Sequence, residues 1–154
     1  MESRILAPPK LESFRRTHRN KRIVFTNGCF DILHRGHVAL LLEAKRLGDV
    51  LVVGINSDQS MHRLKGPSRP LVNEDDRAFL LLQLRPVDYV TVFGEDTPLE
   101  TIRALEPDVL VKGGEYEREG IVGADFVEER GGTVVRVAMV GGYSTRGFIE
   151  KIRG

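Results

Sequence analysis

Short apolar segments alternate with amphipathic ones along most of the chain. From residue 22 onward, runs rich in Val, Ile, Leu and Phe recur between segments whose apolar residues are spaced three or four positions apart. The predicted strands are residues 22–27, 49–56, 88–93, 108–112 and 133–138, and the predicted helices are residues 35–47, 73–84, 97–105, 121–130 and 144–152. This alternation predicts an α/β fold, namely a Rossmann-like, doubly wound parallel five-stranded sheet with helices on both faces.

Two segments stand apart from this alternation. Residues 1–20 contain Pro8 and Pro9 followed by a polar, helix-compatible stretch, which predicts a peripheral N-terminal helical segment. Residues 57–72 are rich in Ser, Gly, Pro and Lys, and their length is typical of a mobile flap over a substrate. Because no repeat or linker interrupts the rest, residues 21–154 are expected to form a single domain.

Composition narrows the class of protein. With 154 residues, of which 41% are hydrophobic and 29% charged, the chain has the composition of a soluble globular domain. A formal net charge of +1 gives no electrostatic reason to expect a nucleic-acid or membrane partner. No apolar run approaches the roughly 20 residues that span a bilayer. The single Cys29 excludes an internal disulfide, and with no signal peptide this favours the cytoplasm.

The strongest chemical signal lies between the first strand and the first helix, where the chain reads T-N-G-C-F-D-I-L-H-R-G-H. His34 and His37 are three residues apart and share one helix face, so both imidazoles can reach one ligand. A helix N-terminus attracts anions, and Gly36 leaves room for a close approach. These residues predict a phosphate site. Zinc is disfavoured, because Cys29, Asp31 and the two histidines lack the spacing of structural zinc ligands.

This segment resembles the signature of the HxGH nucleotidylyltransferases, in particular their sugar-phosphate and polyol-phosphate branch. Five further segments continue the resemblance in family order: Gly54–Asp58, Arg63–Pro67, Glu95–Pro98, Val111–Gly114 and Gly142–Thr145. Together they cover residues 22 to 152 and are most similar to the adenylyltransferases of ADP-heptose synthesis. In many bacteria that enzyme is the C-terminal half of a bifunctional kinase–adenylyltransferase.

The resemblance implies an enzyme that joins ATP and a sugar 1-phosphate, foremost D-glycero-β-D-manno-heptose 1-phosphate, into an ADP-sugar and pyrophosphate. It also implies Mg²⁺ as cofactor and a homodimer as the assembly. A phosphomonoester nucleophile is already anionic at neutral pH, so the protein must align two anions and stabilise charge rather than supply a base. The Mg²⁺ ion would be held mainly by phosphates and not by direct protein ligands.

The resemblance also assigns roles to single residues. His34, His37 and Lys65 are the catalytic candidates, the histidines as donors to the triphosphate and the lysine as a clamp from the flap, with Arg69 as a weaker second cation. The nucleotide-binding candidates are Asn27, Gly28, Cys29, Phe30, Asp31, Gly36, Arg77, Val111, Lys112, Gly113, Ser144 and Thr145. The sugar-phosphate candidates are Asn56, Asp58, Lys65 and Gly114.

Several of these residues have a purely structural alternative. Phe30 is favoured as a core residue, and Asp31 either caps a turn or orients a histidine or a magnesium ion. Arg77 is equally compatible with a salt bridge on a helix surface. Ser144 or Thr145 is expected to cap the last helix, whose N-terminus would form a second anion site facing the histidines.

Alternatives to the leading function remain at this point. A cytidylyltransferase for glycerol- or ethanolamine-type phosphates typically carries R-T-x-G-I-S-T-T near its C-terminus, whereas residues 141–146 read G-G-Y-S-T-R and favour ATP. Arg146 stands where related branches have a second Thr, and either engages a phosphate or points to solvent. A flavin adenylyltransferase is a less similar option. A non-catalytic nucleotide-binding module is disfavoured by the intact His34, His37 and Lys65.

Overall fold

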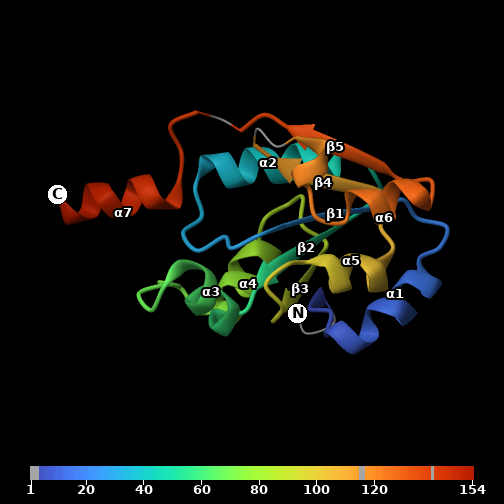
Figure 1. The fold of residues 1–154 in the computed structure, drawn as a ribbon, viewed down its shortest axis with the longest axis horizontal. Helices are drawn as coiled ribbons and strands as arrows, with labels where there is room; N and C mark the ends of the chain where they lie inside the picture. The colour runs from blue at the N-terminus through green and yellow to red at the C-terminus, as the bar shows by residue number, and fades with distance from the viewer. Residues whose placement is uncertain (1–3, 115–116, 140) are drawn as a thin grey trace.

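The computed structural model describes residues 4–114, 117–139 and 141–154, and a five-stranded sheet runs through its centre (Figure 1). The strands are β1 (Ile23–Gly28), β2 (Val50–Asn56), β3 (Tyr89–Phe93), β4 (Val109–Gly113) and β5 (Thr133–Val137). All neighbouring strands are parallel, in the order β3-β2-β1-β4-β5. The predicted five-stranded parallel sheet is therefore confirmed.

Helices cover both faces of this sheet. The α-helices are α1 (Leu11–Thr17), α2 (Arg35–Lys45), α3 (Asp58–Lys65), α4 (Glu74–Leu82), α5 (Leu99–Leu105), α6 (Ala124–Glu129) and α7 (Thr145–Arg153), with short 3-10 turns η2 (Pro8–Lys10) and η3 (Arg118–Gly120). The chain runs outward from β1 to β3, and then returns to the other side of β1 to form β4 and β5. The strand order thus reverses between β1 and β4, and ligands of such sheets bind at the carboxyl ends of the strands near this point.

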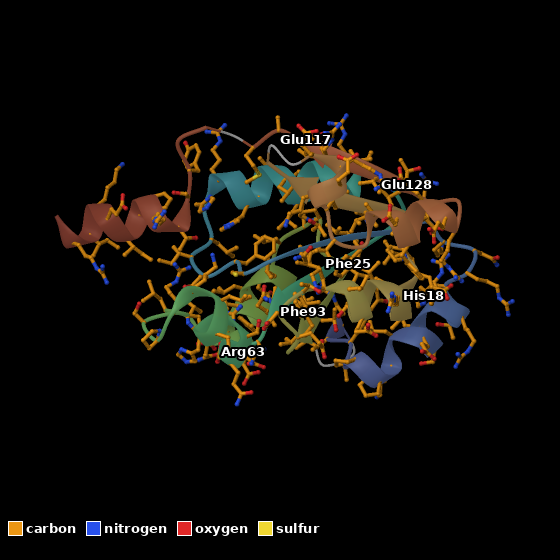
Figure 2. All side chains as sticks on the ribbon, viewed as in Figure 1. His18, Phe25, Arg63, Phe93, Glu117 and Glu128 are labelled. Carbon is orange, nitrogen blue, oxygen red and sulfur yellow. The ribbon has the colours of Figure 1, made fainter. Side chains whose placement is uncertain are left out.

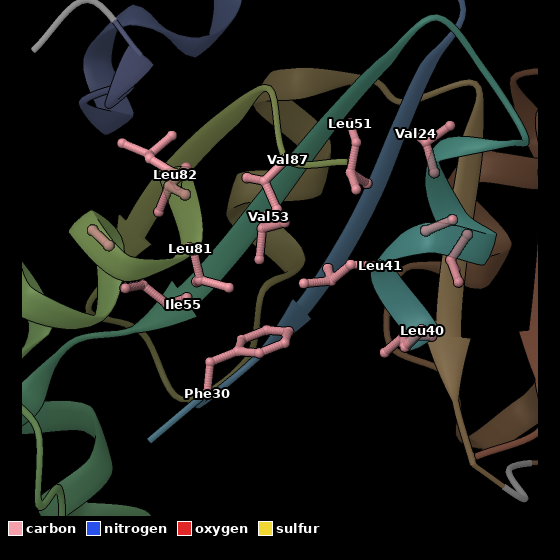
Figure 3. Close-up of a cluster of buried hydrophobic side chains, with 14 of the residues drawn as sticks. Val24, Phe30, Leu40, Leu41, Leu51, Val53, Ile55, Leu81, Leu82 and Val87 are labelled. Atoms are coloured by element: carbon pink, nitrogen blue, oxygen red, sulfur yellow. The ribbon is translucent and has the colours of Figure 1, made fainter. Parts of the chain in front are cut away.

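Each face of the sheet has its own core. On one face, α2 and α4 bury Leu40, Leu41 and Leu81 against β1 and β2, together with Phe30 from the turn after β1 (Figure 3). On the other face, α1, α5 and α6 pack over Phe25 and its neighbours. The two faces are continuous apolar surfaces, as expected for parallel strands that are buried on both sides.

A glycine in β2, Gly54, lies against two buried phenylalanine rings. The rings of Phe25 and Phe93 lie near the middle of the molecule (Figure 2). A Cβ atom on Gly54 would come within 2.6 Å of Phe25 Cζ and 3.4 Å of Phe93 Cε1. The glycine therefore makes room for both rings.

The N-terminal segment is more integrated than its polar sequence suggests. Ile5 forms a parallel bridge with Val90, and the Leu6 amide donates to the Val90 carbonyl at 2.8 Å, so the segment covers the outer edge of β3. In α1, Leu11 and Phe14 are buried in the core. The segment thus belongs to the layer that covers the second face.

The prediction that residues 57–72 form a flap without secondary structure is wrong for the first half of that range, which folds as α3. Ser57 caps the helix by accepting a hydrogen bond from the Ser60 amide at 3.1 Å. Lys65 is consequently the last residue of a helix and not part of a free loop.

The last helix, α7, extends away from the sheet at the left of Figure 1, with the C-terminus at its far end. None of its residues is buried. Within the part of the chain that the structure describes, no helix combines the length and apolar character needed to cross a membrane.

Candidate active site

A cleft of about 510 Å³ lies at the carboxyl end of β1. Four parts of the chain line it: the turn after β1, the start of α2, the end of α3 with the following loop, and the segment that leads into α7. The lining residues are Gly28, Cys29, Phe30, His34, His37, Lys65, Arg69, Met139, Tyr143, Ser144, Thr145 and Arg146. Three of these side chains are cationic and none is a carboxylate, so the described lining of the cleft favours an anionic ligand.

The two histidines stack on each other at the start of α2. Their ring centroids are 3.7 Å apart, with 22° between the planes. His34 Nδ1 accepts a hydrogen bond from the Gly36 amide at 3.1 Å, and His37 Nδ1 accepts one from the His34 amide at 3.3 Å. An accepting Nδ1 carries no proton, which assigns the proton of each neutral ring to Nε2. The helix start therefore leaves each histidine with one N–H donor for a ligand.

Burial keeps both rings uncharged. It lowers the pKa of His34, and it lowers the pKa of His37 to about 4, with repulsion from His34 as the smaller cause. At neutral pH the pair thus offers hydrogen-bond donors without a fixed positive charge. A bound polyphosphate would favour the protonated form of either ring, because opposite charges stabilise each other.

The turn that precedes the histidines is shaped by one aromatic ring. Phe30 has φ of 51°, in the left-handed region, and its buried ring lies against His37 with a centroid distance of 5.0 Å. A Cβ atom on Gly28 would come within 2.9 Å of Phe30 Cε2. Phe30 is thus a core residue, as its sequence context favoured, and the packing of its ring supports a backbone conformation that costs roughly 1–3 kcal/mol.

Asp31 anchors the loop that carries Arg69. Its carboxylate accepts hydrogen bonds from the amides of Leu71 and Val72, at 2.9 and 2.8 Å, and from Arg69 Nε at 2.6 Å. Burial by itself raises the pKa of Asp31, but the two amides and Arg69 outweigh it and hold this pKa below its usual value. Asp31 therefore holds the loop against the turn and presents Arg69 to the cleft.

Arg77 lies beneath the cleft and not on its surface. Its side chain is fully buried and donates to the carbonyl oxygens of Val72, Cys29 and Asn56, at 2.8, 2.9 and 2.9 Å. A fourth hydrogen bond reaches Asp58 Oδ1 at 2.8 Å. The alternative of a salt bridge on the helix surface is thus wrong, because the guanidinium is an internal tie between the ends of β1 and β2 and the segment around α3.

Two of the proposed sugar-phosphate residues belong to this same network. Asn56 is buried and donates from Nδ2 to Ser60 Oγ at 2.9 Å, while Asp58 pairs with Arg77. Neither residue lines the cleft, so the structure places both of them behind the turn and not beside His34 and His37.

None of the candidate residues at the end of β4 is among those that line the cleft. Lys112 lines a second cavity of about 200 Å³ together with Asn27, and burial lowers its pKa against the opposing effect of Cys29. Val111 is buried within the sheet. A Cβ atom on Gly113 would come within 2.6 Å of Met139 Sδ, and the Gly114 amide donates to the Val137 carbonyl at 3.0 Å.

The start of α7 completes the cleft. Ser144 is the N-cap and accepts a hydrogen bond from the Gly147 amide at 2.9 Å, while Thr145 Oγ1 donates to the Ile32 carbonyl at 3.3 Å. The N-termini of α2 and α7 therefore meet at one cleft. Each brings free amides and the positive end of a helix dipole, which is an arrangement suited to a polyphosphate.

Comparison with known proteins identifies the family. Residues 25–138 match the family model described as cytidylyltransferase-like. The chain belongs to the cytidylyltransferase-like family.

Curated relatives in this family are much longer than the chain. It is 59% identical over 134 residues to the bifunctional protein HldE of Syntrophotalea carbinolica, a match that covers 87% of this chain and 27% of that protein. It is 55% identical over 137 residues to the bifunctional protein HldE of Helicobacter pylori strain G27, covering 88% and 28%. The chain thus spans about a quarter of the length of these relatives.

Two solved structures share the fold. The lipopolysaccharide core biosynthesis protein from Thermoplasma volcanium has a TM-score of 0.63 and 31% identity, with 78% of this chain and 97% of that chain covered. Pantoate-beta-alanine ligase from Francisella tularensis has a TM-score of 0.62 and 14% identity, with 87% and 66% covered. The second likeness concerns the fold alone.

Two residues that line the cleft were not among the candidates predicted from the sequence. Met139 and Tyr143 both line the cleft, beside the capping residue Ser144. Tyr143 lies inside the segment Gly142–Thr145, which carries part of the family resemblance, so its position was the available signal. Nothing in the sequence around Met139 marks it.

Across residues 4–114, 117–139 and 141–154, no group of three or more His, Cys, Asp or Glu side chains is placed to hold a metal ion.

Proposed function

We propose that the chain is an adenylyltransferase that joins ATP and a sugar 1-phosphate into an ADP-sugar and pyrophosphate, with D-glycero-β-D-manno-heptose 1-phosphate as the foremost acceptor. The observation that carries the proposal is the stacked pair His34 and His37, each with a free Nε2–H at a helix N-terminus in a cationic cleft. The relatives named bifunctional protein HldE and the resemblance to ADP-heptose adenylyltransferases support the choice of substrates.

The reaction is a direct in-line displacement. A phosphate oxygen of the sugar phosphate attacks the α-phosphorus of ATP, the bond from that phosphorus to the bridging oxygen breaks, and pyrophosphate leaves with the electron pair. Because the nucleophile is already an anion, no side chain has to remove a proton. The chain's task is to hold two anions together and to stabilise the charge that develops around the α-phosphate.

The cleft residues divide this task. His34 and His37 donate from Nε2 to phosphate oxygens, and these hydrogen bonds strengthen as charge builds up in the transition state. Lys65 and Arg69 approach from the end of α3 and its loop, and Arg146 from the start of α7. The described lining holds no carboxylate, which fits a Mg²⁺ ion carried by the phosphates; when bound, that ion neutralises part of their charge. The assembly proposed is a homodimer, which light scattering of the full chain tests.

The substrates are tested by pyrophosphate release in Mg²⁺ buffer. ATP and CTP are each combined with heptose 1-phosphate, with hexose 1-phosphates and with glycerol 3-phosphate. Release only with ATP and heptose 1-phosphate supports the proposal. A preference for CTP with glycerol 3-phosphate would move the chain to the alcohol-phosphate branch, and ATP binding without any release would indicate a non-catalytic module.

The histidine roles are tested by substitution. Changing His34 or His37 to Ala should lower kcat by about 10²–10³-fold, with a much smaller change in the Kd for ATP. His62→Ala is the matched control, because His62 is exposed on α3 and does not line the cleft. Turnover of a cleft variant within a few-fold of the control would refute the mechanism.

A further inference from the structure

Three aromatic rings lie around His34. Its ring stacks on that of His37, at a centroid distance of 3.7 Å. The Tyr143 ring lies nearly parallel to it, at a centroid distance of 6.2 Å and an angle of 21°, and the Phe148 ring lies at 5.7 Å and 32°. The rings of Tyr143 and Phe148, called the outer rings below, come from the C-terminal segment, more than a hundred positions away in the chain.

The glycine between the histidines permits this approach. A Cβ atom on Gly36 would lie 3.0 Å from His34 Cε1 and 3.3 Å from Tyr143 Cβ, which is tighter than ordinary contact at both atoms. Gly36 therefore does more than admit a ligand to the backbone. It allows the imidazole of His34 and the side chain of Tyr143 to pack over the first turn of α2.

The attachment of α7 depends on the same contacts. The helix buries no residue of its own, and Ile152 near its end is 81% exposed. Contacts between the body and this segment include the hydrogen bond from Thr145 Oγ1 to the Ile32 carbonyl and the two rings beside His34. The rings are thus placed where the helix meets the cleft.

We propose that Tyr143 and Phe148 are positioning residues whose rings hold the imidazole of His34 in the orientation from which Nε2–H donates into the cleft. The C-terminal segment then has two roles. Its helix start faces the cleft, and its aromatic side chains fix His34. The kinetic part of this inference rests on the proposed function, whereas the placement of the ring does not.

A consequence for the protonation of His34 follows. Burial is the cause of its lowered pKa. The two outer rings have their centroids 6.2 and 5.7 Å from that of His34, so we expect them to shield it from water. Removing them admits water, so the pKa of His34 should rise towards its ordinary value of 6.5. The titratable or charged groups that line the same cleft are Cys29, His37, Lys65, Arg69, Tyr143 and Arg146, and of these the test changes only Tyr143.

The test combines ring NMR with kinetics on the full chain. The chain has four histidines, so the imidazole signals can be assigned from single His variants, with His18 and His62 as internal references outside the cleft. In the double variant Tyr143→Ala with Phe148→Ala, we expect the pKa of His34 to rise and the nitrogen shifts of the Nε2–H tautomer to be lost. The kcat for pyrophosphate release should fall about a hundredfold, because a misplaced donor no longer meets the transition state.

Matched variants separate positioning from other effects. Tyr143→Phe keeps the ring and should keep both the His34 signals and kcat. Ile152→Ala alters the exposed end of α7 and should change neither. If the double variant does not fold, as judged by urea unfolding, then Tyr143→Leu and Phe148→Leu singly serve the same comparison.

Two results would overturn the inference. One is a fall in kcat with the pKa and tautomer of His34 as in the wild type, which would mean that the rings act directly on the nucleotide. The other is a double variant with unchanged His34 signals and unchanged kcat. A wild-type chain that releases no pyrophosphate would refute the proposed function, while the NMR comparison would still decide the positioning role.

Discussion

Replacing Arg77 with Met tests whether this residue is an internal tie or a ligand of phosphate. The substitution keeps most of the volume and removes four hydrogen bonds, three to carbonyl oxygens and one to Asp58. The guanidinium is charged in all four bonds, so each contributes at least the roughly 1 kcal/mol of a neutral hydrogen bond, and the free energy of unfolding should fall by at least about 4 kcal/mol.

The assay is urea and thermal unfolding of the full chain. A loss of about 4 kcal/mol lowers the Tm of a domain of this size by about 8–16 °C. Arg63→Met is the matched control, because Arg63 and Asp96 form a pair in which the side chains are 49% and 59% exposed. Figure 2 shows Arg63 at the edge of the molecule. Such an exposed pair contributes about 0–1 kcal/mol. An Arg77 variant as stable as the control, but with a weakened Kd for ATP, would refute the structural role and make Arg77 a phosphate ligand.

Three further predictions concern the cleft. Gly36→Ala should reduce kcat because its Cβ would press on the first histidine ring at 3.0 Å, whereas Gly94→Ala, with its nearest atom at 3.9 Å, should not; equal pyrophosphate release from the two variants would contradict this. The pKa of His37 is about 4 in the folded chain and 6.5 ordinarily. Its contribution to stability is therefore present above pH 6.5 and is lost as the pH falls towards 4. The urea midpoint of His37→Phe should depend less on pH in this window than that of the wild type. Asp31→Asn should cost about 3 kcal/mol and raise the KM for ATP, because Arg69 loses its charged partner; unfolding curves and steady-state kinetics test it, and an unchanged KM would argue against the role of Arg69.

The sheet could be predicted from the sequence because its strands are continuous apolar runs separated by helical patterns. The predicted strand at residues 22–27 differs by one residue at each end from Ile23–Gly28, and the alternation with helices determines that the strands are parallel. The helix Asp58–Lys65 was missed because only Ser60 and Met61 of its residues are buried. Such a helix shows no apolar stripe to mark it.

The candidate site could be predicted in part because of the topology of the parallel sheet. His34 and Ser144 are brought to one cleft because both follow strands whose carboxyl ends lie at one edge of the sheet. The direction of each side chain is a separate matter, decided by partners far away in the chain. Arg77 and Asn56 have the polar character of ligand-binding residues, yet their hydrogen bonds tie segments of the protein together beneath the turn. The spacing of residues along the sequence does not predict these long-range partners.

The division of the interior into two cores has a consequence for how this protein can change over evolutionary time. The turn with Phe30, the helix with the histidines and α4 share the core on one face, whereas no buried side chain of the opposite core lines the 510 Å³ cleft. Substitutions that repack α1, α5 and α6 around Phe25 can therefore accumulate while the geometry of the histidines is preserved. Sequence change should therefore be greater in that half of the molecule. Substitutions that raise stability without lowering turnover are also best sought there.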